Sequence, residues 1–517
     1  MSTQPTIHPV GSRALLVDLP DLTAVMDWHA ALSASPLEHQ TDVIAAARTV
    51  LVTFDSPAAA TAAASQLRDF HPATARRSDP RDITIEVLYD GADLGELASS
   101  LGKSPEELIT WHTSTTWVAA FGGFAPGFTY CVPEDPAQAL DIPRRATPRT
   151  AVPAGAVALA GDFSAVYPRT SPGGWQLIGT TTTPMWDSAA NPPALVAPGD
   201  RVRYVAVDTL ASNAAPSHSH LARPSRRPIF TVDDPGLQTL YQDLGRQGNG
   251  NLGVTTSGSA DRASARTANA AVGNDRNATL LENVGGLTLT ALAETVVCVT
   301  GAAADVTVGG RPILLATPTI VPAGAELVVS APRTGMRSYI AVRGGLIADT
   351  ELDSAATDML SGLGPAPLQA GDTVSVSLTP PQSANALLSN PLRVSREGAA
   401  TVGVVRCVLG PRDDWFSAED VERFLSTTFT VTADSNRVGV RLETDTPIER
   451  SRAGELPSEG MVAGSVQIPP SGQPVVFLRD HAVTGGYPVI ATVINEDVDI
   501  AAQLPPGGKI RFELYSR

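Results

Sequence analysis

Hydrophobic and polar positions alternate in short runs along most of the chain, and glycine or proline turns separate these runs. This pattern predicts many short β-strands. The stretch 457–494 shows it well, because an alternating run at 465–468 leads through the turn 469–472 into an apolar run at 475–478. We expect two strands there, joined by the turn.

Helical patterns interrupt the strands at a few places. Ser104 is suited to cap a helix that begins at Pro105, and Asp261 is suited to cap a helix that ends before Gly273. The pattern predicts strands at 14–17, 49–53 and 83–89. It predicts helices at 58–70, 91–101 and 262–272. The fold class is therefore expected to be mainly β with α+β.

The length of 517 residues predicts two to four domains. We expect the following division: a small α+β domain at 1–85, a β-barrel at 86–207, a linker at 208–228, a β-rich part at 229–392 and a second β-rich part at 393–517. The linker is predicted from its proline, serine and alanine content. Because it carries no motif, its expected role is to tether the two halves.

The charge balance narrows the range of partners. The chain has 37 basic and 53 acidic residues, a net charge of −16, which argues against nucleic acids and anionic membranes. No apolar run reaches about 18 residues, and the N-terminus lacks a secretory pattern, so we expect a soluble, cytoplasmic protein. Three scattered cysteines support neither a disulfide framework nor a cysteine metal site, and no metal is predicted.

Lysine is nearly absent, and this restricts the chemistry. Lys103 and Lys509 are the two lysines of the chain. The segment 102–104 resembles the end of a phosphate-binding loop, but Leu97 stands where the first glycine is needed. Neither lysine lies in an Ala-Met-Lys-Met context, so no covalently bound cofactor is expected. ATP or biotin, if used, would enter through another chain.

The end of the second strand in 457–494 gathers chemical groups. Asp480, His481, Gly485, Gly486 and Tyr487 fall within eight residues. Glycines allow a ligand to approach the backbone, and polar side chains can orient it. An equally weighted alternative is a capped hairpin end, in which Asp480 holds turn amides and Tyr487 packs at the edge of the core. Neighbours in a regular strand face opposite sides, so Asp480 and His481 are not both expected in one pocket.

A second candidate site precedes the helix at 262–272. Ser257 and Gly258 lie just before its expected N-terminus, where backbone amides can hold a carboxylate or phosphate, and Asp261 is the expected cap. Capping alone is the alternative function of this loop.

Turns that carry arginines suggest a third candidate site. Arg149 and Arg169, together with Arg144 and nearby aromatic residues, are expected at the mouth of the first barrel, where they would suit a carboxylated ligand. Pairing of these arginines with carboxylates of the protein is the alternative.

With these motifs, the chain resembles two families joined end to end. Residues 1–206 resemble the Kip-inhibitor family, which includes allophanate hydrolase subunit 1 and the B component of 5-oxoprolinase. Residues 229–517 resemble the Kip-antagonist family, which includes allophanate hydrolase subunit 2 and the C component of 5-oxoprolinase. The matching segments are 123–128, 148–149, 152–155 and 167–175 in the first half, and 242–246, 257–261, 457–460 and 484–488 in the second. The resemblance implies cyclophilin-like β-barrels after the small N-terminal domain.

The resemblance also implies an activity. The favoured function is that of fused B and C components of an ATP-dependent 5-oxoprolinase, which opens 5-oxoproline to glutamate with a separate kinase-like A component of the lactam-utilisation type. Asp480 is then expected first as the base, with His481 second, Tyr487 as a hydrogen-bond donor, and Ser257 with its following amides as the anion holder.

Two alternative functions stay open. Oligomers are possible with the favoured function and with either alternative. One is a carboxyltransferase of the urea carboxylase pathway that uses biotin carried by another chain, with Gly485 and Gly486 admitting its ring. The other is a non-catalytic module that binds a regulatory kinase.

Overall fold

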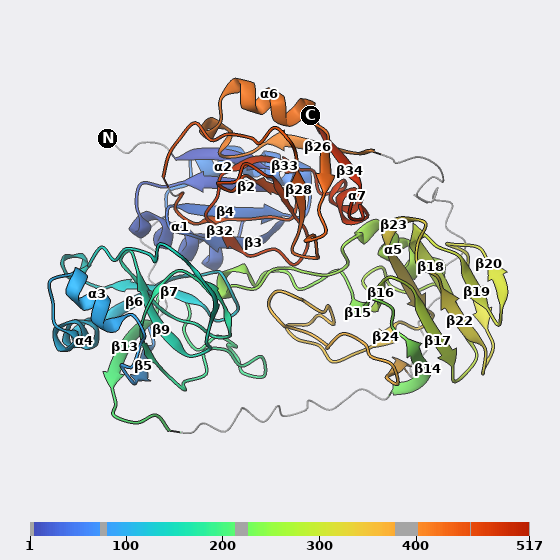
Figure 1. Cartoon of the computed structure of the whole chain (residues 1–517), viewed down its shortest axis with the longest axis horizontal. Coiled ribbons are helices and arrows are strands. Elements are labelled where there is room, and N and C mark those ends of the chain that lie inside the picture. The colour runs from blue at the N-terminus through green and yellow to red at the C-terminus, as the bar shows by residue number, and fades with distance from the viewer. Residues whose placement is uncertain (1–4, 73–79, 212–225, 378–401, 455, 516–517) are drawn as a thin grey trace.

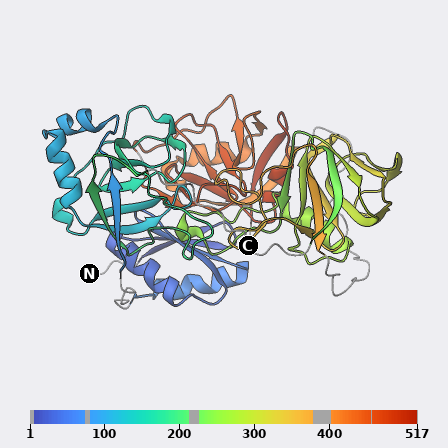
Figure 2. The same cartoon turned by 90° about the horizontal axis from the view of Figure 1, so that it is seen from below.

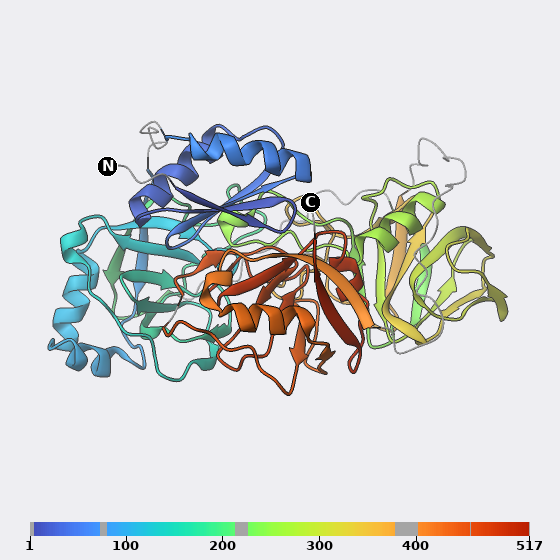
Figure 3. The same cartoon turned by 90° about the horizontal axis from the view of Figure 1, so that it is seen from above.

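The computed structural model of the chain describes residues 5–72, 80–211, 226–377, 402–454 and 456–515. These residues form four units (Figure 1). The first and fourth units lie against each other at the centre, with a barrel at one end and a sandwich at the other (Figures 2 and 3). The expected boundary at 392/393 and most of the linker 208–228 lie outside the described residues.

The first unit is a four-stranded antiparallel sheet with two helices on one face. Its elements are β1 (Thr6–Val10), β2 (Ala14–Asp18), α1 (Leu22–Ala34), β3 (Gln40–Ala45), β4 (Thr49–Phe54) and α2 (Pro57–Arg68). Strand alternation separates its two faces: Leu15 and Val17 pack under the helices, whereas Leu16 and Leu51 pack against Val483 of the fourth unit. Both faces of this sheet are therefore covered.

The second unit is a seven-stranded sheet in the order β12-β9-β10-β7-β6-β13-β5. Its strands are β5 (Asp82–Val87), β6 (Trp117–Gly122), β7 (Thr129–Pro133), β9 (Ala156–Ala160), β10 (Phe163–Val166), β12 (Gln176–Thr180) and β13 (Arg201–Ala206), with the ribbon β8 (Arg149–Val152) and β11 (Ser171–Gly173) and the helices α3 (Leu94–Ser100), α4 (Pro105–Ser114) and η1 (Pro136–Gln138). A bridge between Leu88 and Thr180 joins its two edges, which makes it the expected barrel. Ser104 is the N-cap predicted for α4, and with Glu107 it also forms a capping box.

The third unit is a sandwich of two sheets with one shared apolar core. One sheet contains β14 (Arg226–Asp234), β17 (Leu287–Ala291), β19 (Val306–Val308), β20 (Arg311–Ile313), β22 (Glu326–Val329), β24 (Leu346–Ile347) and β25 (Thr373–Ser377). The other contains β15 (Gln238–Gln242), β16 (Leu280–Val284), β18 (Thr295–Ala303), β21 (Thr319–Val321) and β23 (Thr334–Val342). The helix α5 (Arg262–Ala271) packs its alanines on the outer face of the second sheet, and η2 (Gly250–Leu252) precedes it.

The fourth unit is a closed barrel in the order β26-β33-β30-β31-β28-β27-β34. Its elements are β26 (Val402–Leu409), β27 (Phe429–Val431), β28 (Gly439–Glu443), β30 (Ser465–Gln467), β31 (Val475–Phe477), β33 (Val489–Val493) and β34 (Lys509–Leu514), with the ribbon β29 (Glu459–Gly460) and β32 (Thr484–Gly485) and the helices η3 (Asp413–Trp415), α6 (Ala418–Ser426) and α7 (Val498–Ala502). The pairing of β30 with β31 confirms the two strands predicted in 457–494.

The two barrels share a strand plan. In each, the first strand pairs in parallel with the last: β5 with β13, and β26 with β34. A glycine with positive φ, Gly155 or Gly464, stands immediately before the equivalent strands β9 and β30, and a short ribbon lies beside each barrel. The two barrels therefore present the same framework twice, with different loops.

Candidate functional site

A cavity of about 370 Å³ lies where the first unit, the segment before α5 and the fourth unit meet. Its wall includes Val10–Ala14 and Thr41–Asp42 of the first unit, Val254–Ser257 before α5, and His481 of the fourth. Pockets for small molecules typically measure about 300–1,000 Å³. The cavity is therefore large enough for a small ligand, and both halves of the chain build it.

His481 lines this cavity and is almost fully buried. Its Nδ1 lies 2.8 Å from the carbonyl oxygen of Ala482, and its Nε2 lies 3.5 Å from Oγ1 of Thr255. A carbonyl can only accept, so Nδ1 carries the proton and Nε2 keeps a lone pair. Burial lowers the pKa of His481 to about 4, helped by the positive charge of Arg479. The ring is thus neutral near pH 7 and can accept a hydrogen bond from a ligand.

Ser257 also lines the cavity, from a strained backbone. Its φ is +52°, unusual for a residue other than glycine. Gly258 follows with φ +88°, and a Cβ on it would lie 2.6 Å from the carbonyl carbon of Leu244. The loop is therefore packed too closely for a side chain at 258. Ser257 donates to Oδ1 of Asp480 at 2.7 Å, so its hydroxyl links the cavity to the buried acid behind it.

Asp480 does not line the cavity. Its carboxylate is 0% exposed and accepts from Nε and Nη2 of Arg437, both at 2.9 Å, from Ser257, and from the amide of Met359 at 3.0 Å. With both oxygens used, it has no free position from which to take a proton from substrate or water. The expectation that Asp480 is the first choice as base is thus corrected. Of the two neighbours, His481 faces the cavity.

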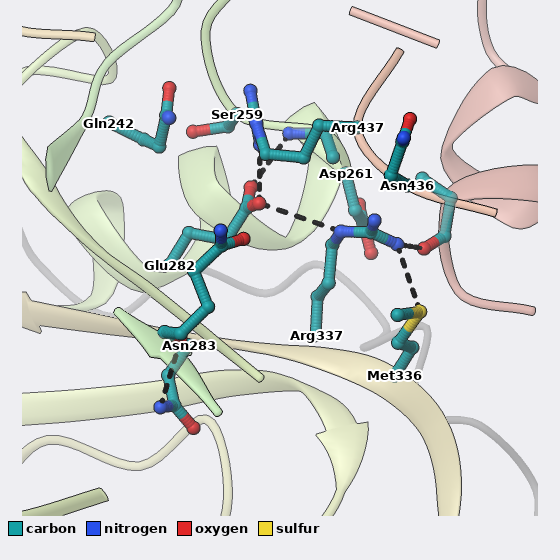
Figure 4. A network of polar contacts seen from close by, with 12 residues as sticks. Gln242, Ser259, Asp261, Glu282, Asn283, Met336, Arg337, Asn436 and Arg437 are labelled. Carbon is teal, nitrogen blue, oxygen red and sulfur yellow. Dashed lines mark hydrogen bonds and ion pairs between the residues drawn. The ribbon is translucent and has the colours of Figure 1, made fainter. Parts of the chain in front are cut away.

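Arg437 joins Asp480 to a larger buried network. Figure 4 shows the part of this network around Glu282, Arg337 and Arg437. Its Nη1 donates to Oε1 of Glu282, and its Nη2 donates to the carbonyl of Gly258 at 2.7 Å. On its other side Glu282 faces Arg337, whose Nε lies 3.5 Å from the same Oε1. All four charged groups are nearly inaccessible to solvent. The network fixes the fourth unit to the third and holds the loop at 257–258.

Asp261 is the N-cap predicted for α5. Its Oδ1 accepts from the amide of Ser264 at 2.9 Å, and its Oδ2 accepts from Ser264 Oγ and from Nε2 of Gln503. Burial and the nearby Asp499 carboxylate raise the pKa of Asp261 to about 6. Because its oxygens serve the helix and Gln503, Asp261 acts as a cap rather than as a ligand contact.

The segment 484–488 lies apart from the cavity. Gly485 pairs with Glu459 in the ribbon β29–β32, and a Cβ on it would lie 2.5 Å from Nε2 of Gln467. Glycine is thus needed there for packing against the barrel. Gly486 has more room, and Tyr487 is 45% exposed. The structure does not bring Gly485, Gly486 or Tyr487 to the cavity with His481, so a role for Tyr487 as a donor there is not supported.

The predicted arginine rim is also corrected in part. Both Nη atoms of Arg149 bond the carboxylate of Asp93, at 2.8 and 2.7 Å, as in the alternative interpretation. The neighbouring aromatics Phe128 and Trp175 are buried in the core, with ring centroids 5.5 Å apart, rather than at a mouth. Arg169 instead lies toward the third unit, where a Cβ on Gly362 would be 3.3 Å from its Nη1.

Sequence reasoning missed most of the charged residues of the cavity wall. They are Arg13, Asp42, Asp55, Arg262, Arg266 and Arg479. Asp42 accepts from the amide of Gly250 at 3.0 Å, which joins the first unit to the second half, and burial raises its pKa to about 6. Arg479 is adjacent to the predicted pair, and Arg262 and Arg266 lie in the helix predicted at 262–272, but Arg13, Asp42 and Asp55 stand in segments with no motif.

Asp42→Asn should change stability in a pH-dependent way. Asp42 has a native pKa of about 6 against an ordinary 3.8, so the native state holds its proton more tightly between these values, and stability from this group is lost as pH rises from about 4 to 6. One pKa unit corresponds to about 1.4 kcal/mol. The free energy of unfolding of the variant minus that of the wild type should therefore increase by about 2–3 kcal/mol between pH 4 and pH 7. Urea titrations at each pH measure this difference. The exposed Asp445→Asn is the control, and parallel curves for Asp42→Asn and wild type would contradict the expectation.

Among the described ranges, no group of three or more histidine, cysteine, aspartate or glutamate side chains is arranged to hold a metal ion. No helix in that part of the chain is both long and apolar enough to span a membrane.

Comparison with known proteins connects both halves to named relatives. The C subunit of 5-oxoprolinase from Escherichia coli (strain K12) is 32% identical over 281 residues, which cover 54% of this chain and 88% of the relative. The B subunit of 5-oxoprolinase from Escherichia coli O157:H7 is 45% identical over 132 residues, 25% of this chain and 59% of the relative. Urea amidolyase of Lachancea kluyveri is 30% identical over 308 residues, 55% of this chain and 17% of the relative.

The whole chain also has a structural counterpart. The crystal structure of TTHA0988 aligns with a TM-score of 0.83 at 33% identity, and the alignment covers 97% of this chain and 99% of the other. At the level of families, the carboxyltransferase domain, subdomains A and B, matches residues 252–514, and the carboxyltransferase domain, subdomains C and D, matches residues 5–196. The chain therefore belongs to the carboxyltransferase domain family, with subdomains C and D in its first half and A and B in its second.

Proposed function

We propose that this chain is the fused B and C component of an ATP-dependent 5-oxoprolinase, which opens 5-oxoproline to glutamate together with a separate ATP-using protein. The observation that carries the proposal is that one chain contains relatives of two 5-oxoprolinase subunits, the C type at 32% identity and the B type at 45%. The shared cavity supports it, because residues of both halves line one space. Fusion keeps the two halves at a high effective concentration.

The chemistry requires a partner. A lactam is stabilised by resonance, so its opening near pH 7 needs activation, for which phosphorylation of the amide oxygen by an ATP-using partner is suited. We assign that step to a kinase-like A component of the lactam-utilisation type. This chain would hold the lactam, with Nε2 of His481 accepting a hydrogen bond from the ring N–H. Phosphorylation of the oxygen removes the ring N–H proton, so the hydrogen bond to His481 belongs to the lactam before activation. Water would then add to the activated carbon, and the ring C–N bond would break with a proton delivered to nitrogen. A second water would hydrolyse the resulting acyl phosphate to glutamate and phosphate.

The test is reconstitution. The purified chain alone should neither hydrolyse ATP nor form glutamate from 5-oxoproline, and both activities should appear together when the lactam-utilisation partner is added. Release of phosphate and formation of glutamate are measured in the same reaction. ATP turnover by the isolated chain, or phosphate release without glutamate, would contradict the proposal.

The second candidate is a carboxyltransferase that uses biotin on another chain. The family to which the chain belongs and the 30% identity to urea amidolyase support it. The same preparation, given a carboxylated biotin carrier and urea, separates the two. Carboxylation of urea, without opening of 5-oxoproline in the complete mixture, would favour the carboxyltransferase.

A further inference from the structure

The cavity collects positive charge inside an acidic protein. Arg262, Arg266 and Arg479 all contribute to its wall, although the chain has a net charge of −16. Arg262 and Arg266 are one turn apart on α5, and Arg479 follows β31 of the barrel. Asp499 is the carboxylate that faces them: it accepts from Nη2 of Arg479 at 3.3 Å and from the backbone amide of Arg262 at 3.1 Å. Arg13, Asp42 and Asp55 stand in the same wall, so four guanidinium groups against three carboxylates leave an excess of one positive charge.

Two of these guanidinium groups keep a buried nitrogen without a hydrogen bond. On Arg479, which is 5% exposed, Nη1 bonds Asn495 and Nη2 bonds Asp499, but Nε has no partner among the described residues. On Arg262, Nη2 donates to the carbonyls of Leu244 and Ser257, and again Nε has no partner in that part of the chain. An unmade buried hydrogen bond costs about 1–3 kcal/mol, so an acceptor supplied by a ligand in this cavity would stabilise both arginines.

The electrostatics agree with the geometry. Burial lowers the pKa of Arg262 well below its ordinary value, and the charge of Arg479 lowers it further. Burial likewise lowers the pKa of Arg479, and Arg266 adds to the effect. Hydroxyls from both halves, Ser12 Oγ and Thr492 Oγ1, also line the cavity as buried atoms without partners among the described residues. An anion bound here would relieve the repulsion and satisfy donors from both halves.

We propose that Arg262 and Arg479 form a carboxylate subsite of this cavity, which recognises a small organic acid. The inference rests on the proposed function: for 5-oxoproline, the two Nε–H groups would hold the ring carboxylate, while Nε2 of His481 accepts from the ring N–H. Guanidinium groups suit this role because they donate in a fixed geometry that matches a carboxylate. A neutral lactam or urea lacks the group that the arginines bind, so the subsite selects for the acid.

Calorimetry on the full chain tests the subsite directly. 5-Oxoproline should bind, and 2-pyrrolidinone, the same ring without a carboxylate, should bind at least about ten-fold more weakly. Arg479→Gln and Arg262→Gln should each weaken 5-oxoproline binding by about 10–100-fold, the value of a charged hydrogen bond, and leave 2-pyrrolidinone unchanged. Arg441→Gln, at an exposed position on the barrel, is the control.

If Arg479→Gln or Arg262→Gln does not fold, Arg266→Gln takes its place in the test. The Arg266 side chain is exposed and makes no bond to a described residue, so this change tests charge alone and should weaken binding of the acid several-fold. Equal binding of acid and neutral ring by the wild type, binding of neither, or indifference of acid binding to all three arginine changes would overturn the subsite.

The subsite and the proposed function fail in different ways. If the complex with its partner opens 5-oxoproline and neither Arg479→Gln nor Arg262→Gln raises its KM, the subsite is wrong and the function stands. If the arginine changes abolish binding of the acid to this chain but the complete complex does not open the lactam, the subsite stands and the function is wrong.

Discussion

Replacing Asp480 with asparagine should lower the free energy of unfolding by about 3–5 kcal/mol, the range for removing one partner of a buried ion pair. The carboxylate accepts four hydrogen bonds, two of them from Arg437, at a site with no solvent exposure. An asparagine side chain offers one oxygen, and its NH₂ group would face donors. Arg437 would then be left buried with Glu282 as its remaining carboxylate partner among the described residues. Chemical denaturation measures the loss.

The control for Asp480→Asn is a pair of the same type on the surface. Asp414 bonds Arg452 at 2.8 Å, with both side chains about half exposed. Asp414→Asn should change stability by no more than about 0.5 kcal/mol, because exposed pairs contribute little. An Asp480→Asn variant with unchanged stability and an about 100-fold lower turnover in the assembled complex would restore Asp480 as the base.

Much of the local structure could be predicted because it depends on neighbouring residues. The helix predicted at 262–272 is observed as Arg262–Ala271, with Asp261 as its cap, and the strand predicted at 475–478 is observed as Val475–Phe477. Caps, turns and alternation act within a few residues, so a single sequence reveals them. The first barrel could also be expected from its short strands and turns, whereas the second was implied by the family resemblance, because the same pattern suits a sandwich equally well.

The site could be predicted only in part, because its residues come together through tertiary packing. The rule of alternating faces predicts that Asp480 and His481 do not share a pocket. His481 lines the cavity and Asp480 does not, but both residues lie beyond the end of β31, so strand alternation is not the reason. Which of them faces the cavity depends on Arg437, 43 residues away along the chain, which draws the acid inward. Arg262 likewise reads in the sequence as an ordinary helix surface residue. It becomes part of a cavity wall only because the first unit and the barrel enclose that end of α5.

Arg412 links the first unit to the fourth. Its Nε donates to Glu459 at 2.7 Å, and its Nη1 and Nη2 donate to the carboxylate of Asp18 at 3.0 and 2.6 Å. Glu459 is 5% exposed, and burial raises its pKa, whereas the pKa of Asp18 is lowered because bonds to His8 and Arg412 outweigh its burial. Arg412 therefore pairs with one acid from each unit.

Arg412→Met should lower the free energy of unfolding by about 3–5 kcal/mol, since methionine keeps much of the volume but leaves Glu459 buried without its cation. The double variant Arg412→Met/Glu459→Gln should recover most of this loss, because the amide carries no charge to desolvate. The control is Arg511→Met, which removes a pair with Glu513 whose side chains are both about half exposed. This change should cost no more than about 0.5 kcal/mol.

Arg412→Met should also weaken ligand binding in the cavity. The first and fourth units that Arg412 holds together also form two sides of the cavity wall, so loosening their contact should raise the KM of the assembled complex for its acid substrate more than it lowers kcat. Steady-state kinetics on Arg412→Met below its melting temperature measure this split. Unchanged stability and unchanged KM would show instead that the apolar contact of Leu16 and Leu51 with Val483 holds the units together without the ion pairs. Leu51→Ala would then become the variant with the larger effect, by about 2–5 kcal/mol for a buried leucine.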